Sequence, residues 1–169
     1  LKDGSDAEKA LAARIDQLWK AAEWSWHCNG QNVLFWHWSP QHDFGMNHPI
    51  KGFDECMIAY VLGTSSPTHA IPAAAYHEGW ARSGDIVGQH TIEGHTINLN
   101  YNNKYGIGPL FWTHYSFLGL DPRGLGDKYA KNYFDEFKNY TLGHRDYCVR
   151  NPKAYKGYGE DAWGLTASY

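Results

Sequence analysis

The sequence predicts a mainly α-helical fold in which long, aromatic-rich loops and one small β-hairpin join the helices. Apolar residues recur with the spacing of a helix face near the start of the chain and again in its last third. Between these regions, turn-forming pairs break the periodicity, and one short stretch alternates in polarity as strands do. At 169 residues, the chain is long enough to form one domain with its own core.

The first predicted helix runs from Asp6 to about Trp24 or Trp26. Ser5 and Glu8 have the spacing of a capping box, in which each side chain binds the other residue's backbone N–H. Behind this cap, apolar residues recur at steps of four, three and four: Leu11, Ile15, Leu18 and Ala22. Because only this stripe is apolar, we expect the helix to pack on another element along that side.

A long irregular loop is predicted from Cys28 to Gly52. Turn-forming pairs interrupt it throughout. The loop nevertheless holds five large apolar side chains: Phe35, Trp36, Trp38, Phe44 and Met46. Long loops in compact domains are usually functional or disordered, and disordered segments are poor in aromatic rings. The composition therefore favours a functional loop.

Two helices and a hairpin are predicted for the middle of the chain. The first helix covers Asp54 to Leu62 and is ended by Gly63. The second covers Pro72 to Arg82, where the proline suits the first turn. Residues His90 to Leu99 alternate on both sides of a glycine, which is typical of a β-hairpin.

The last third holds an apolar segment, Leu110 to Leu118, that is predicted to be helical or buried. The longest predicted helix follows, from Tyr129 to Val149, with a potential break at Gly143. Asn151 and a proline after it end this helix.

Helices alternate with long loops that carry aromatic side chains. This order of elements resembles that of a toroid of paired helices, in which the loops build a ligand cleft at one end. Residues Tyr158 to Tyr169 form an acidic, aromatic turn that is predicted to open a further helix, and the sequence stops there. A domain seldom ends at the beginning of a helix. We therefore expect residues 1–169 to be a fragment of one domain, from which flanking helices are missing at both ends.

Composition narrows the classes of function. The net charge is −3 and there is no basic stripe, so a nucleic-acid partner is not expected. No apolar run approaches the roughly 20 residues of a membrane span. Cys28, Cys56 and Cys148 form no CxxC pair and are expected to be small buried residues rather than zinc ligands. The 8 Trp, 12 Tyr and 7 Phe are typical of a dense core or of a groove that stacks sugar rings.

Two acidic pairs are candidates for chemistry. Asp54-Glu55 is predicted to open a helix, where the helix dipole alone would favour acidic residues. Alternatively, one of these carboxyl groups faces an aromatic cleft that desolvates it, as a general acid requires. Glu160-Asp161 lies between glycines beside a tryptophan and has the same two interpretations. A glycosidase needs two carboxyl groups across the scissile bond, and either Glu160 or a residue outside this sequence would be the partner of Glu55.

Aromatic and histidine residues supply further candidates. If their segment is extended, Trp36 and Trp38 point to one side and His37 points to the other. The two tryptophans then either form a platform for a sugar ring or pack in the core. The weaker candidates of the same kind are Trp80, His114 and Tyr115. The histidines form no HExxH motif, so no metal is expected. The sequence also contains no serine-hydrolase motif and no nucleotide-binding motif, and no cofactor is expected.

Six segments together resemble the glycoamylase-like domain, a family that includes bacterial endo-β-1,2-glucanases of glycoside hydrolase family 144. They occur in a consistent order along nearly the whole chain: Asn32 to Pro40, Gly52 to Ile58, Ser65 to His69, Gly108 to Phe111, Gly119 to Gly124 and Gly157 to Ser168. The resemblance implies an (α/α)6 toroid and inverting endo-hydrolysis of β-1,2-glucan to oligosaccharides. It also implies a periplasmic or secreted monomer that acts on an oligo- or polysaccharide.

The resemblance assigns a role to Glu55, because the family's general acid lies in the segment that matches Gly52 to Ile58. Asp54 stands where asparagine is common in the family, so no catalytic role is carried over to it. Loop side chains would bind the sugar: Trp36, His37, Trp38, Trp80, His114, Tyr115, Glu160 and Trp163. The family's other cleft acids fall outside this sequence, so the water-activating base is not assigned. The alternatives are a glucan-transferring, phosphorolytic or other glucan-cleaving enzyme of the same fold, or a non-catalytic glycan-binding domain.

Overall fold

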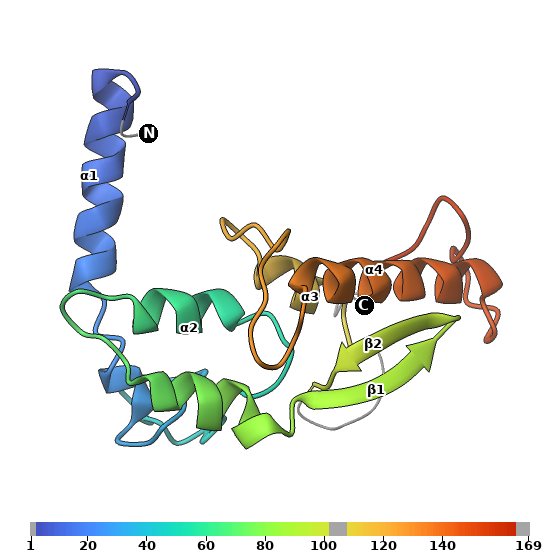
Figure 1. The fold of residues 1–169 in the computed structure, drawn as a ribbon, viewed down its shortest axis with the longest axis horizontal. Helices are drawn as coiled ribbons and strands as arrows, with labels where there is room; N and C mark the ends of the chain where they lie inside the picture. The colour runs from blue at the N-terminus through green and yellow to red at the C-terminus, as the bar shows by residue number, and fades with distance from the viewer. Residues whose placement is uncertain (1–2, 102–107, 165–169) are drawn as a thin grey trace.

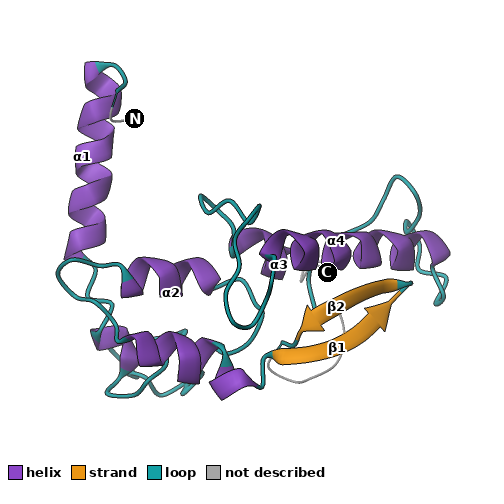
Figure 2. Cartoon of the chain, viewed as in Figure 1, coloured by secondary structure: helices purple, strands orange, loops and turns teal. Residues whose placement is uncertain are grey.

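The computed structural model describes residues 3–101 and 108–164, which are mainly helical with one two-stranded antiparallel sheet. Helix α1 stands away from the other elements, and the hairpin lies beside α4 (Figures 1 and 2). The helices and strands are α1 (Asp6–Ala21), α2 (Met57–Thr64), β1 (Val87–Ile92), β2 (His95–Leu99), α3 (Phe111–Tyr115) and α4 (Tyr133–Arg150). Two short 3-10 turns and a π-helical segment also occur: η1 (Trp26–Cys28), η3 (Arg82–Gly84) and η2 (Ala75–Trp80).

Helix α1 begins where the sequence predicts and ends at Ala21, earlier than expected. Its capping box is confirmed, because Glu8 N donates to Ser5 Oγ at 3.4 Å and Ser5 N donates to Glu8 Oε2 at 2.8 Å. The apolar stripe is 53%, 51% and 56% exposed at Leu11, Ile15 and Leu18. Within residues 3–101 and 108–164, this face of the helix is therefore largely uncovered.

Helix α2 differs from the prediction at both ends. It begins at Met57 rather than Asp54, because the Asp54 carboxylate accepts a hydrogen bond from Cys56 N at 2.8 Å and holds residues 54–56 in a turn. It continues through Gly63 to Thr64. A Cβ on Gly63 would lie 3.1 Å from the side chain of Ile71, so this glycine permits close packing instead of ending the helix.

The helix predicted from Pro72 to Arg82 is largely a π-helical segment, η2, over Ala75–Trp80. Gly79 lets this segment approach the long loop, since a Cβ there would lie 2.7 Å from the carbonyl oxygen of Asn32. Trp80 is fully buried and its ring stacks on Tyr76 with centroids 5.1 Å apart. The segment therefore forms part of the core beneath the loop.

The predicted hairpin is confirmed, although β1 begins at Val87, before His90. Glu93 and Gly94 both have positive φ, which suits the two-residue turn of a right-twisted hairpin. The hairpin is attached to α4 by Glu136, a buried residue whose carboxylate accepts hydrogen bonds from Asn98 N and Asn98 Nδ2, each at 2.8 Å.

The last third is helical at the two predicted places. The segment Leu110 to Leu118 contains α3, and α4 runs without a break at Gly143, which is buried. Helix α4 begins at Tyr133 rather than Tyr129, because the side chain of Asn132 accepts a hydrogen bond from Phe134 N at 3.1 Å and caps the helix there.

The core lies where η2, the hairpin and α4 meet the turn before α2, and aromatic rings dominate it. The largest buried side chains include Phe53, Tyr60, Trp80, Tyr133 and Tyr140. Cys28 and Cys148 are buried and Cys56 is half-buried, and all three are free thiols. None of the described helices is long and apolar enough to cross a membrane. The helix expected at the end of the chain falls on residues 165–169, outside the described residues.

Candidate functional site

A pocket of about 210 Å³ lies between the long loop, the turn before α2 and Tyr101, two residues after the end of β2. It brings the carboxyl groups and the thiol of one short segment together with aromatic rings from distant parts of the sequence. Its lining residues are Trp36, His48, Ile50, Asp54, Glu55, Cys56 and Tyr101.

The acidic turn on one side of this pocket is fixed by the residues just before it. Gly52 N donates to Trp80 O at 2.7 Å, and Phe53 N donates to Asn100 O at 3.0 Å. Gly52 has a φ of 93°, which a residue with a side chain adopts only with strain. Phe53 is 2% exposed and packs on the ring of Tyr133, so the turn is anchored in the core.

Ser116, directly after α3, holds the same turn from the other side. Its hydroxyl donates to the carbonyl oxygen of Asp54 and accepts a hydrogen bond from Met57 N at 3.1 Å. Ser116 is fully buried. Because one hydroxyl serves both groups, the backbone is fixed on each side of Glu55.

The long loop reaches the pocket by pairing with itself. Trp36 N donates to His48 O at 3.0 Å, and the two rings meet edge-on with centroids 5.8 Å apart. Tyr60 of α2 fixes the base of this pairing, because its hydroxyl donates to Ile50 O at 2.7 Å and accepts from Leu34 N at 3.0 Å. Trp36 remains 57% exposed and is free to stack on a ligand.

Tyr101 supplies the third side of the pocket. Its ring stacks on Trp112 with centroids 3.8 Å apart. Its carbonyl oxygen accepts a hydrogen bond from Arg82 Nη1 at 3.2 Å, and its backbone bridges to Gly52. The end of the hairpin is thereby tied to the acidic turn.

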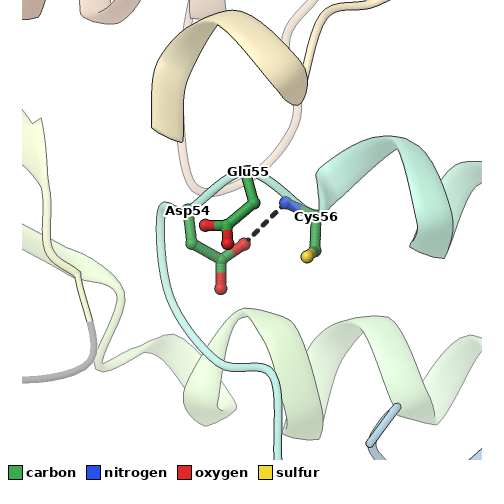
Figure 3. A group of neighbouring side chains, drawn as sticks. All are labelled: Asp54, Glu55 and Cys56. Atoms are coloured by element: carbon green, nitrogen blue, oxygen red, sulfur yellow. Dashed lines mark hydrogen bonds between the residues drawn. The ribbon is translucent and has the colours of Figure 1, made fainter. Parts of the chain in front are cut away.

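Asp54 and Glu55 have adjacent carboxyl groups in different environments (Figure 3). Asp54 is 5% exposed, and its Oδ1 accepts the hydrogen bond from Cys56 N. Burial raises the pKa of Asp54 to about 7, against the opposing effect of that hydrogen bond, and the negative charge of Glu55 adds to the increase. Burial also raises the pKa of the Cys56 thiol, to about 12. Glu55 is only partly buried and lines the pocket.

Within the described part of the chain, the side chains of Asp54, Glu55 and Cys56 bring three potential metal-binding atoms within 4.8 Å of one another. They do so because they are consecutive in the sequence. A metal ion binds the deprotonated forms of these side chains, whereas burial here favours the neutral forms of Asp54 and Cys56.

Among the predicted site residues, the structure brings Glu55 and Trp36 into one pocket. His37 is half-buried beside Trp36, with ring centroids 6.3 Å apart. Trp38 is 37% exposed and packs edge-on against Trp26 at 5.0 Å, in a neighbouring aromatic cluster of the same loop.

Trp80 is the predicted site residue that the structure contradicts. Its side chain is fully buried among Tyr76 and Tyr133, so it has no surface on which a sugar could stack. Its side chain lies on the buried face of η2 and does not line a loop. Its role is to support the turn before α2, through its carbonyl oxygen, which accepts from Gly52 N.

The remaining predicted residues lie outside the pocket that contains Glu55. His114 lines a separate hollow next to α4, where its ring packs on Phe137 at 5.1 Å, and Tyr115 is exposed beside Phe111. Glu160, one of the two candidates for the partner of Glu55, lies in an exposed turn and does not line the pocket that contains Glu55. Trp163, 41% exposed, lines another hollow of about 290 Å³.

Sequence reasoning missed His48, Tyr101 and Ser116. The positions of His48 and Tyr101 depend on pairing between distant segments, for which the sequence has no local signal. The family resemblance assigns no catalytic role to Asp54, although Asp54 lines the pocket. An indication of its burial was available, because it follows the apolar Phe53 and precedes an apolar helix.

Comparison with known proteins shows that the chain is similar to proteins that are named for action on glucans. Residues 47–169 match the family described as glycoamylase, "putative glucoamylase". An exo β-1,2-glucooligosaccharide sophorohydrolase (non-reducing end) from Parabacteroides distasonis is 39% identical over 97% of this chain. The solved structure of an endo-β-1,2-glucanase from Chitinophaga pinensis, in complex with sophorotriose and glucose, is 57% identical over 99% of the chain, with a TM-score of 0.89.

A "putative glucoamylase" from Bacteroides caccae is similar to the same extent, with 56% identity over 99% of the chain and a TM-score of 0.90. The chain spans only part of each relative: 25% of the sophorohydrolase, 40% of the endoglucanase chain and 41% of the B. caccae chain. The described fold is therefore shared with one part of these larger proteins.

Proposed function

Because the chain belongs to the glycoamylase family, we propose that the intact protein is a glycoside hydrolase that cleaves β-1,2-linked glucan. The observation that carries the proposal is the placement of Glu55 in a pocket with the exposed ring of Trp36. The names of two relatives, a sophorohydrolase and an endo-β-1,2-glucanase, support the same substrate class.

In this proposal Glu55 is the general acid. It gives its proton to the oxygen of the scissile glycosidic bond, the bond from the anomeric carbon to that oxygen breaks, and water adds from the opposite face. Inversion follows if the added water loses its proton to a base on that opposite face. We assign no residue to this base.

The sugar would be held mainly by ring stacking. Trp36 is the residue best placed for this role, since it lines the pocket and exposes 57% of its surface. His48 and Tyr101 add polar and aromatic edges to the same pocket. We retain the predicted residues that are exposed or half-buried as more distant sugar contacts: His37, Trp38, His114, Tyr115, Glu160 and Trp163.

We further propose endo-cleavage within an (α/α)6 toroid, in the periplasm or outside the cell. Endo-cleavage is favoured because the chain is 57% identical to the endo-β-1,2-glucanase and 39% identical to the exo-acting relative. The toroid would require further helices against the uncovered stripe of α1.

The proposed activity is tested with the intact protein and purified β-1,2-glucan. Early products of mixed chain length are expected from endo-cleavage, whereas release of sophorose alone would contradict it. Omitting phosphate should not change the products, and a phosphate requirement would contradict hydrolysis.

The role of Glu55 is tested by Glu55→Gln, which keeps the shape of the side chain and removes its acidic proton. We expect kcat to fall by about 10²-fold or more, the typical contribution of a general acid. Glu23→Gln changes an exposed acid that precedes η1 and does not line the pocket, and it should retain wild-type activity. Normal turnover by Glu55→Gln would show that another group is the acid.

A further inference from the structure

The pocket holds a second carboxyl group to which the proposed reaction assigns no role. Asp54 is 5% exposed and lines the same pocket as Glu55. The oxygen atoms of the two side chains approach within 4.8 Å, and both carboxyl groups lie on the inner side of the turn (Figure 3). The backbone on both sides is fixed by Ser116, so the two groups are held close to each other.

Two carboxylates at this separation, one of them buried, are costly to ionise together. Among the described residues, the hydrogen-bond donor to the Asp54 side chain is the backbone N–H of Cys56, and no Lys or Arg forms an ion pair with it. A single backbone N–H offsets only part of the cost of burying a charge. One proton on the pair removes the second negative charge.

Resting on the proposed function, we propose that Asp54 is a positioning residue for the catalytic proton: Asp54 and Glu55 share one proton, so that the pair still holds a proton for Glu55 to donate near neutral pH. During cleavage the O–H bond on Glu55 breaks, an O–H bond forms on the leaving sugar oxygen, and the pair afterwards takes a proton back from solvent. The titration belongs to the pair rather than to either residue alone.

The raised pKa of Asp54, about 7, agrees with this geometry. Other titratable groups also face the pair from the surrounding elements and have to be separated from it. They are Cys56 on the same turn, Tyr60 on α2, Tyr101 after β2, Tyr140 on α4 and His48 on the long loop. Burial raises the pKa of Cys56 and of the three tyrosines, away from neutral pH. His48 is separated from the pair by its own substitution, described below.

The first measurement needs no turnover. Infrared difference spectra of the intact protein should show a protonated-carboxyl band that titrates near pH 7 in the wild type. In Asp54→Asn no carboxyl band should titrate near pH 7. Asparagine keeps the acceptor for Cys56 N, so the turn is preserved. In Glu55→Gln the band should remain and titrate at lower pH, because the neighbouring negative charge is gone. An unchanged midpoint in Glu55→Gln, or a band that still titrates near pH 7 in Asp54→Asn, would overturn the proposal.

The second measurement is the pH profile of kcat/KM on β-1,2-glucan. In Asp54→Asn, the alkaline limb should move to lower pH by about one unit or more, since interacting carboxyl groups shift each other's titration by such amounts. In His48→Gln, the limb should keep its wild-type position. A limb that moves in His48→Gln and stays in Asp54→Asn would assign the titration to the histidine and contradict the pair. Normal activity of Glu55→Gln would instead refute the proposed role of Glu55 as the general acid, while the infrared titration would still decide on the pair.

Discussion

Asp54 and Glu55 are neighbours in the sequence, yet the tertiary structure gives their carboxyl groups different tasks. Asp54 turns into the protein and accepts the hydrogen bond that delays α2, whereas Glu55 remains partly accessible in the pocket. The sequence identified the pair and favoured Glu55 through family resemblance. It could not show that Asp54 is buried, because burial depends on Phe53 and Ser116 packing against distant segments.

Sugar binding by a single residue can be tested by substituting Trp36. Trp36→Ala removes the exposed ring and should raise KM for glucan by about 10- to 100-fold, as expected for the loss of about 1.5–3 kcal/mol of apolar burial against the sugar. The effect on kcat should be smaller, because Glu55 and its turn are held by other contacts.

Tryptophan 38 supplies the comparison for this experiment. Its ring packs on Trp26 in the adjacent cluster and does not line the pocket. Trp38→Ala should therefore raise KM less than Trp36→Ala does. Equal effects of the two substitutions would show that the pocket ring has no special part in binding.

Secondary-structure elements were predicted most reliably where the signal is local. The capping box of α1 and the Glu93-Gly94 turn of the hairpin depend on residues close in sequence, and both are confirmed. Helix α2 was misplaced because the Asp54 side chain competes with the helix for backbone N–H groups. The sequence predicts a helix end at Gly63, but α2 continues to Thr64, and the missing side chain of Gly63 permits close packing against Ile71.

At the level of elements, we predict that the attachment of the hairpin to α4 contributes to the stability of the fold. Glu136→Gln replaces one of the two acceptor oxygens with a donor and removes the charge, which weakens both bonds to Asn98. We expect the free energy of unfolding to fall by about 1–3 kcal/mol, the range for hydrogen bonds to buried charged groups. Urea unfolding of the intact protein measures the change.

Lys138→Gln provides the control on the same helix, since Lys138 is exposed. Its unfolding should match that of the wild type within about 0.5 kcal/mol. If Glu136→Gln unfolds like this control, the hairpin is held by packing rather than by the carboxylate.

Stability of the whole molecule should depend on pH through Asp54. Its pKa is about 7 in the folded protein, above the ordinary value of 3.8, so the folded state binds more protons between these values. The free energy of unfolding from this group therefore decreases as pH rises from about 4 to 7. In Asp54→Asn, this decrease in the free energy of unfolding with rising pH is absent. The variant should therefore be more stable than the wild type at pH 8, by up to a few kcal/mol.

The comparison of these two proteins at several pH values isolates Asp54 from other groups. Burial lowers the pKa of His144 to about 4, which has the opposite effect on stability, but this histidine is present in both proteins and cancels. The difference in unfolding free energy should shrink towards pH 4. A difference that is constant over this range would show that the carboxyl group does not titrate with folding.

The uncovered face of α1 also belongs to the scale of the whole molecule. Its apolar stripe was predicted from periodicity and is confirmed, but within the described residues no element covers it fully. The relatives share this fold at TM-scores of 0.89 and 0.90 and extend well beyond it. These facts support the toroid proposed above, in which further helices would pack on the stripe.

The sequence by itself determined the helical class, the hairpin, the family and Glu55 as the candidate acid. These features depend on local periodicity, on turn residues and on motifs that are read in order along the chain. Only the tertiary structure decided that Trp80 is core, that Glu160 lies apart from Glu55, and that His48, Tyr101 and Asp54 join the pocket. The reason is physical: burial, and with it the pKa of Asp54, is set by backbone pairing and packing between segments that are distant in sequence.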